Sequence, residues 1–165
     1  MTETEQQVLD ALAALGIAWT RHEHPPVFTV EEAGQHWAAI DATHCKNLFL
    51  RNKTGHAHYL VVAERSARVD LKQLTAVLGE DRLSFGSPER LLACLGLTAG
   101  SVSPFGLLND AAHAVTVVVD EALRSASRVA FHPNVNTSTV TLTFADFARF
   151  LASRATPVRY ASFGA

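Results

Sequence analysis

The chain has 165 residues, of which 48% are hydrophobic and 18% charged, and its formal net charge at pH 7 is -2. This length and composition predict one soluble globular domain, residues 1–165, with enough apolar side chains for a substantial core. The slightly acidic balance argues against a DNA-binding protein, and it leaves RNA binding to a local basic patch.

The compartment can be inferred from the cysteines and from the first residues. Cys45 and Cys94 are too far apart for a CxxC motif, and the opening MTETEQQ lacks the basic and apolar regions of a signal peptide. No apolar run approaches the roughly 20 residues of a membrane helix. We therefore expect a cytoplasmic protein with reduced thiols and no membrane contact.

The predicted elements begin with a helix over residues 4–15, whose apolar positions share one face and which Gly16 ends. Residues 17–22 predict a short strand. A second helix is expected to open at Thr29, with Glu32 three residues later as in a capping box.

A hairpin follows, with β-like runs at residues 48–51 and 58–63 and turn residues at 53–55. The rest of the chain interleaves helices and strands. Helices are predicted from Asp70 to Gly79, between Ser87 and Gly96, and over residues 145–152, and strands over 83–85, 115–120, 128–131 and 140–142. The spacing is not a strict βαβ repeat. It predicts an α/β fold of the α+β type, with a mixed, mostly antiparallel twisted sheet or partial barrel surrounded by helices.

Three polar segments between apolar runs could carry chemistry. CKNLFL (45–50) places a lysine and an amide at the mouth of a strand, GSVSPFG (100–106) has glycines at both ends, and FHPNVNT (131–137) holds a histidine and two asparagines. A glycine loop can present backbone N–H groups to a carbonyl or a phosphate. Each segment also has a structural interpretation, namely a solvated edge lysine, a connecting turn and an Asx-type turn.

Other catalytic patterns are missing from the sequence. The pairs His22/His24 and His56/His58 have no evident third ligand, so no metal site is expected. No GxSxG, GxGxxG or Walker motif occurs, and the cysteines have no local partner for nucleophilic catalysis. We expect no cofactor.

The three segments in this order resemble the YbaK/prolyl-tRNA-synthetase-associated editing domains, and most closely their free-standing alanyl-tRNA(Pro) deacylases. The resemblance covers about residues 5–152 and depends most on KNLFL, the GxxxP loop and FHPNVNT. It implies an aminoacyl-tRNA hydrolase in which water attacks the ester directly. The expected partner is the acceptor end of tRNA(Pro), with prolyl-tRNA synthetase as a second candidate.

The resemblance also implies roles for individual residues. Lys46 matches the lysine that holds the 3′-terminal adenosine, and Asn47 stands beside it. Gly100 matches the glycine whose loop orients the ester carbonyl, and His132 the histidine that shapes the aminoacyl pocket. The remaining loop residues Ser101, Ser103 and Pro104 are expected to contact substrate. Asn134 and Asn136 receive no catalytic role.

A basic patch outside the pocket is expected to hold the acceptor stem. Arg51 and Lys53 lie on the hairpin and Arg82 precedes the next strand, so together they could bind phosphates in a salt-dependent way. Two alternatives to alanine editing stay open. The protein could remove another amino acid such as cysteine, or it could be a non-catalytic module that binds tRNA or a synthetase.

Overall fold

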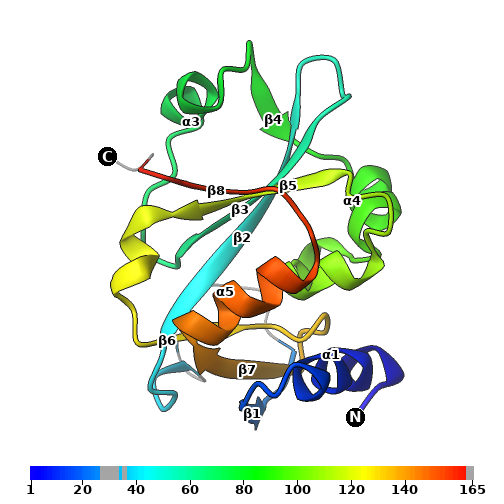
Figure 1. Cartoon of the computed structure of the whole chain (residues 1–165), viewed down its shortest axis with the longest axis vertical. Helices are drawn as coiled ribbons and strands as arrows, with labels where there is room; N and C mark the ends of the chain where they lie inside the picture. The colour runs from blue at the N-terminus through cyan, green and yellow to red at the C-terminus, as the bar shows by residue number, and fades with distance from the viewer. Residues whose placement is uncertain (27–33, 35–36, 163–165) are drawn as a thin grey trace.

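The computed structural model describes residues 1–26, 34 and 37–162 (Figure 1). Eight strands form one sheet: β1 (Thr20–Glu23), β2 (Thr43–Asn52), β3 (His58–Glu64), β4 (Leu83–Phe85), β5 (Val115–Asp120), β6 (Arg128–Phe131), β7 (Ser138–Thr143) and β8 (Val158–Ala161). The α-helices of the described residues are α1 (Glu3–Ala14), α3 (Leu71–Leu78), α4 (Pro88–Leu95) and α5 (Phe144–Ser153), and short 3-10 helices are η1 (Ala99–Ser101), η2 (Pro104–Asn109) and η3 (Glu121–Ser125). None of these helices is both long and apolar enough to cross a bilayer.

The sheet is mixed, as the sequence predicts. The strand order is β1-β7-β6-β2-β3-β5-β8, and β4 pairs with β2 beside this path. Four pairings are antiparallel (β1–β7, β2–β3, β2–β4 and β6–β7) and three are parallel (β2–β6, β3–β5 and β5–β8). The parallel pairs join segments far apart in sequence, which is why local patterns do not reveal them.

Strand β2 spans the whole molecule in Figure 1 and is shared by both halves of the sheet. One of its edges pairs with β3, whereas the other pairs with β6 at residues 43–44 and with β4 at residues 50–52. On this edge, residues 45–49 therefore lie between the part of β2 that pairs with β6 and the part that pairs with β4. The lysine and the amide of the CKN segment fall in that gap.

Most predicted helix ends are confirmed by capping contacts. The Asp70 side chain accepts from the N–H groups of Lys72 and Gln73, and Ser87 accepts from Arg90. Gly79 ends α3 with φ 70°, a left-handed conformation that glycine adopts without steric cost. The helix predicted to open at Thr29 lies outside the described residues.

Two differences from the prediction concern strands. Strand β2 begins at Thr43, five residues before the predicted run 48–51, because its polar start pairs with β6 and β3. Strand β8, which was not predicted, forms because it pairs in parallel with β5. In both cases a distant partner strand supplies the backbone hydrogen bonds, and local composition carries no sign of it.

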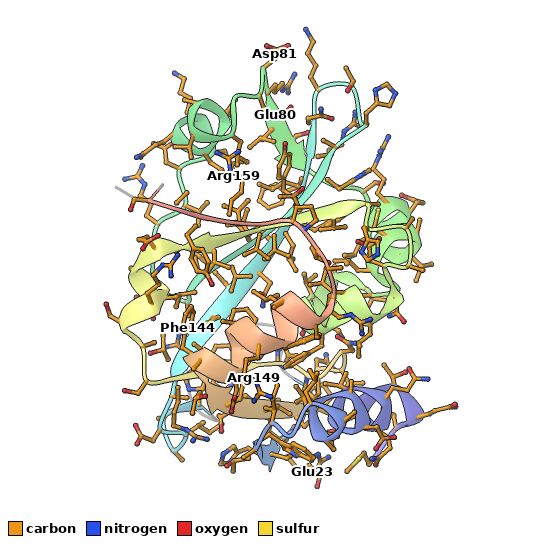
Figure 2. All side chains as sticks on the ribbon, viewed as in Figure 1. Glu23, Glu80, Asp81, Phe144, Arg149 and Arg159 are labelled. Atoms are coloured by element: carbon orange, nitrogen blue, oxygen red, sulfur yellow. The ribbon has the colours of Figure 1, made fainter. Side chains whose placement is uncertain are left out.

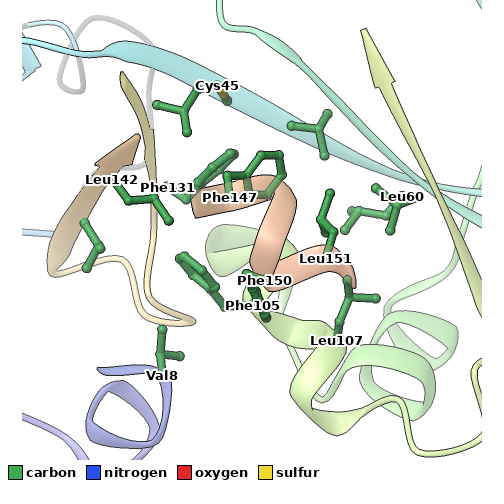
Figure 3. Close-up of a cluster of buried hydrophobic side chains, with 14 of the residues drawn as sticks. Val8, Cys45, Leu60, Phe105, Leu107, Phe131, Leu142, Phe147, Phe150 and Leu151 are labelled. Atoms are coloured by element: carbon green, nitrogen blue, oxygen red, sulfur yellow. The ribbon is translucent and has the colours of Figure 1, made fainter. Parts of the chain in front are cut away.

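The core consists of two clusters on opposite faces of β2 and β3. The larger cluster joins α1, α4, η2 and α5 to β5, β6 and β7, and its centre is aromatic (Figure 3). The ring of Phe147 lies 4.7 Å from that of Phe131, and Phe105 lies 5.1 Å from Phe150. The smaller cluster packs α3 against β2, β3 and β5. The larger cluster holds β6 and α5 together directly behind the FHPNVNT segment.

We predict that Phe147→Ala lowers the free energy of unfolding by about 3–5 kcal/mol, because Phe147 is fully buried and its removal leaves a cavity. The matched control is Phe85→Ala, since Phe85 is 62% exposed, and we expect a change within about 0.5 kcal/mol. Chemical denaturation of both variants measures the difference. Equal losses would contradict the assignment of the core.

Candidate active site

A small pocket lies between the start of β2 and the β6–β7 pair, at the edge of the aromatic core. Its lining includes Cys45 and Phe131, which also belong to the core, together with Ala130 and His132 from the positions next to Phe131. Trp37, His44 and Asn47 close the pocket together with Thr139. The interior offers about 20 Å³ to the centre of a water molecule, which is room for about one water or one methyl-sized group.

His132 lies in the wall of this pocket as a neutral imidazole. Its Nδ1 is 3.1 Å from the backbone oxygen of Ser138, and because a carbonyl can only accept, Nδ1 carries the proton. Nε2 is then the nitrogen with a free lone pair. Burial lowers the pKa of His132, and the neighbouring His24 ring lowers it further, against the opposing effect of the Ser138 carbonyl. The site therefore contains a proton acceptor at neutral pH.

Two aromatic rings lie near the ring of His132. The ring of His24 lies 6.1 Å from it and that of Trp37 6.2 Å from it. Trp37 also stacks on His44 at 4.7 Å, and the guanidinium of Arg65 lies 5.1 Å from the Trp37 ring centre. Burial lowers the pKa of His44 as well. These contacts make a stiff, largely apolar wall beside a polar strand face.

Asn47 connects the pocket to the glycine loop. Its Nδ2 donates to the backbone oxygen of Val102 at 3.4 Å. Its Oδ1 is buried and makes no hydrogen bond with any described residue. A buried acceptor without a partner costs about 1–3 kcal/mol, and here it lines a pocket. This side chain is therefore well placed to accept a hydrogen bond from a bound ligand.

The Gly100 loop faces the FHPNVNT segment. A Cβ at Gly100 would lie 3.7 Å from Nδ2 of Asn136, so the two loops approach each other closely at this exposed glycine. Asn134 adopts φ 62°, a left-handed conformation that asparagine tolerates, and its buried Oδ1 also lacks a partner among the described residues. The FHPNVNT segment thus approaches the Gly100 loop and holds a second buried acceptor.

Two of the expected substrate-contact residues are buried. The hydroxyl of Ser103 accepts from the N–H of Phe105 and caps η2, and Ser103 is fully buried. Pro104 is the first residue of η2 and is also buried. Both residues therefore shape the loop, and their contact with a substrate stays a prediction. Ser101 is partly exposed.

Lys46 does not share the pocket with Asn47. Successive side chains of a strand point to opposite faces, and the Lys46 ammonium group donates to the backbone oxygen of Ala67 on the other side of β2. One carbonyl uses only one of its three N–H donors. We predicted that Lys46 and Asn47 would both lie at the pocket because they are adjacent in sequence. The sequence alone does not show to which face of the strand each side chain points.

The predicted basic patch is brought together, but it lies far from the pocket. Strand pairing places Arg51 opposite Ser84, so Arg82 lies beside the hairpin tip that carries Lys53. Lys53 lies six positions after Asn47 along the extended chain, a distance of roughly 20 Å. Arg51 is partly occupied with the turn, since it donates to the backbone oxygens of Asn52 and Lys53.

Acidic side chains interrupt this patch. Glu80 and Asp81 lie at the same end of the molecule as the hairpin (Figure 2). Glu80 accepts a hydrogen bond from Tyr59 at 2.9 Å, which keeps its carboxylate near β3. The field at this end is therefore of mixed sign, and any phosphate contact depends on individual side chains rather than on a continuous positive surface.

The described lining of the pocket contains no reactive nucleophile. Cys45 lines it, but burial raises the pKa of this thiol to about 12, so the thiol stays protonated at neutral pH and reacts poorly. Across residues 1–26, 34 and 37–162, no group of three or more His, Cys, Asp or Glu side chains is arranged to hold a metal ion. The groups that can act here are the imidazole of His132, the amide of Asn47 and the loop backbone.

Trp37, His44 and Thr139 are pocket residues that the sequence did not reveal. Thr139 could have been found by alternation along the predicted strand, since it lies one residue before the core residue Val140. Trp37 and His44 carry no such signal. His44 lies beside the pocket because β2 pairs with β6 at this residue, and Trp37 stacks on His44.

We predict that the His132 ring titrates below its ordinary pKa of 6.5 and carries its proton on Nδ1 in the neutral form. Because protonation is then easier in the unfolded chain, His132 lowers the stability of the fold as the pH falls from about 6.5 through its folded pKa. Ring-nitrogen NMR over a pH series, with His132→Gln for assignment, measures both properties. A midpoint at or above 6.5 would contradict the buried, neutral ring.

Comparison with known proteins identifies this architecture. A family model described as aminoacyl-tRNA editing domain matches residues 24–150. The chain is 44% identical over 153 residues to the prolyl-tRNA editing protein ProX of Acetoanaerobium sticklandii, which covers 90% of this chain and 91% of that protein. It is 33% identical over 159 residues to prolyl-tRNA synthetase associated domain-containing protein 1 of Danio rerio, with 94% and 86% covered.

A solved structure shows the same fold. The crystal structure of a candidate trans-editing enzyme for prolyl tRNA synthetase superposes with a TM-score of 0.75 at 23% identity and covers 100% of this chain and 99% of that one. The pocket described above lies within the matched segment, with Asn47, Gly100 and His132 all inside residues 24–150. The chain therefore belongs to the aminoacyl-tRNA editing domain family and is by class an aminoacyl-tRNA hydrolase.

Proposed function

We propose that this protein is a trans-editing deacylase that hydrolyses alanyl-tRNA(Pro) to alanine and tRNA(Pro). The observation that carries the proposal is the small pocket between the β6–β7 pair and Trp37. It combines a neutral histidine with a buried amide oxygen that has no hydrogen-bond partner among the described residues. Its relative in Acetoanaerobium sticklandii, 44% identical, is named a prolyl-tRNA editing protein, which supports tRNA(Pro) as the nucleic-acid partner.

The size of the pocket favours alanine as the amino acid removed. About 20 Å³ for the centre of a water molecule accommodates a methyl group but not the three methylene groups of a proline ring. A synthetase that activates proline cannot strongly reject a smaller side chain, and a second site that admits only small ones corrects the error. A pocket of this size also fits cysteine poorly, because the CH2–SH side chain of cysteine is larger than the methyl group of alanine.

The chemistry requires little more than positioning, because an aminoacyl ester is already activated. In the proposed reaction a water oxygen attacks the carbonyl carbon, the bond from that carbon to the ribose 3′ oxygen breaks, and the leaving oxygen receives a proton. Nε2 of His132 or the neighbouring ribose 2′ hydroxyl orients the water. The Asn47 amide oxygen accepts from the substrate's ammonium group, and N–H groups of the Gly100 loop bind the developing oxyanion.

Lys46 and the hairpin patch are proposed to bind tRNA outside the pocket. The ammonium group of Lys46 has two donors left after its bond to Ala67, which suits a phosphate. Lys53 and Arg82 would reach the acceptor stem about 20 Å away. A docking role toward prolyl-tRNA synthetase is the second candidate interaction, favoured by the synthetase-associated names of the relatives.

We predict that the purified protein hydrolyses alanyl-tRNA(Pro) and spares prolyl-tRNA(Pro), with a ratio of kcat/KM of about 100 or more, because overfilling a packed pocket is costly. Deacylation assays with alanyl-, cysteinyl- and prolyl-tRNA(Pro) measure it. Faster hydrolysis of the cysteinyl substrate would mean that cysteine, and not alanine, is the amino acid removed. If the protein binds tRNA(Pro) but hydrolyses none of the three esters, it is a tRNA-binding module and not a deacylase.

We predict that Lys53→Glu and Arg82→Glu each weaken binding of tRNA(Pro) and flatten its salt dependence by about one unit in the log–log slope. Hydrolysis at saturating tRNA should be unchanged, because the patch lies far from the pocket. Lys72→Glu on α3 is the matched control, since it changes the net charge equally at an exposed position. If all three variants bind alike, the patch has no part in recognition.

A further inference from the structure

A carboxylate from the first helix is buried beside the β1–β7 pair. Glu5 is 1% exposed, although it belongs to the first turn of α1. It receives hydrogen bonds from Arg21 of β1 and from the Ser138 hydroxyl of β7, each at 2.5 Å. In Figure 1, α1 lies directly against β1 and β7 at the lower edge of the molecule. Three segments distant in sequence therefore converge on one carboxylate.

The carboxylate stays ionised in this position. Burial alone would raise the pKa of Glu5, but the hydrogen bonds from Arg21 and Ser138 and the charge of Arg21 outweigh burial and hold the pKa below its usual value. A charged acceptor makes stronger hydrogen bonds than a neutral one. Its bond to the Ser138 hydroxyl is thus a firm tie between α1 and the first residue of β7.

Ser138 also makes the contact that orients His132. It is fully buried, its hydroxyl donates to Glu5, and its backbone oxygen accepts from Nδ1 of His132 at 3.1 Å. The same residue pairs with Glu23 at the end of β1. A shift at Ser138 would therefore move the one acceptor that fixes the tautomer of the pocket histidine.

We propose that Glu5 is a positioning residue for His132, acting through Ser138 from a helix that precedes the matched editing domain. The matched segment begins at residue 24, so α1 and β1 lie outside it and still complete the support of its pocket. The catalytic consequence rests on the proposed function, whereas the effect on the His132 ring does not.

The action is geometric rather than a long-range effect of charge. The pKa of His132 is set by burial, by the Ser138 carbonyl and by His24, and Glu5 does not contribute directly. Glu5→Gln keeps an oxygen that can accept from the Ser138 hydroxyl, and it should preserve the geometry. Glu5→Ala leaves that hydroxyl without its acceptor and leaves Arg21 with the exposed Glu23 carboxylate 3.7 Å away, and it should release Ser138.

The first test observes the free protein by ring-nitrogen NMR. In the wild type and in Glu5→Gln the His132 ring should be in the Nδ1–H form, and in Glu5→Ala it should become a mixture of both tautomers. Asp10→Ala is the matched control, because Asp10 is an exposed carboxylate on the same helix. An unchanged His132 spectrum in folded Glu5→Ala would overturn the proposal.

Ser138→Ala covers the case in which Glu5→Ala does not fold. This variant removes the hydrogen bond from the residue 138 hydroxyl to Glu5. It leaves the α1 sequence and the backbone carbonyl of residue 138 in place. It should shift the His132 ring in the same direction as Glu5→Ala. A folded Ser138→Ala protein with the wild-type ring spectrum would show that the tie to Glu5 does not position the histidine.

The second test is a double-mutant cycle with alanyl-tRNA(Pro). Glu5→Ala should lower kcat about tenfold or more, as expected when a catalytic group loses its orientation, with Glu5→Gln close to the wild type. In a His132→Ala background the same change should have no further effect. Additive losses would mean that Glu5 supports only the fold. If the wild type itself is inactive, the proposed function fails, and the NMR result alone decides the role of Glu5.

Discussion

The alternation of side chains along β2 is the constraint on which the rest of the structure depends. Cys45 and Phe49 point into the aromatic cluster, and Leu50 points into the smaller cluster under α3. Asn47 shares the direction of Cys45 and reaches the pocket, whereas Lys46 points to the opposite side. Strand β2 thus separates the two core clusters. The same alternation places the side chains of Lys46 and Asn47 on opposite faces of the strand.

The site combines groups that packing has already adjusted. Burial keeps His132 neutral and Cys45 protonated, so the available chemistry is proton acceptance and not thiolate attack. The buried Oδ1 atoms of Asn47 and Asn134 have no hydrogen-bond partner among the described residues, which is costly in the free protein. A ligand that donates to them would recover that cost on binding. This is a form of preorganisation, in which the fold holds acceptors in place before the substrate arrives.

Support for the pocket extends well beyond the residues that line it. The Phe147 and Phe131 rings hold α5 against β6 from behind, and the tie from Glu5 to Ser138 holds β7 from the side of α1. The connection between β6 and β7 includes Asn134 in a left-handed conformation, which asparagine tolerates. Strands on both sides hold the two ends of this connection.

The sequence by itself determined the local elements and the residue types of the site. Capping residues such as Asp70 and Ser87, with glycines after the helix ends, placed α3 and α4 correctly, and the β-branched run at 115–120 placed β5. These signals are local, because a cap or an alternation acts between residues a few positions apart. The resemblance of three motifs to editing domains was also readable without any structure.

Only the tertiary structure decided which of these residues meet. It brought Trp37 and His44 to the pocket, turned Lys46 away from Asn47, buried Ser103 and Pro104, formed β8 and placed Glu5 against the hydroxyl of Ser138. Each of these outcomes depends on strand register or on the packing of distant elements. Register and packing arise from contacts between residues far apart in the chain, and no local pattern records them.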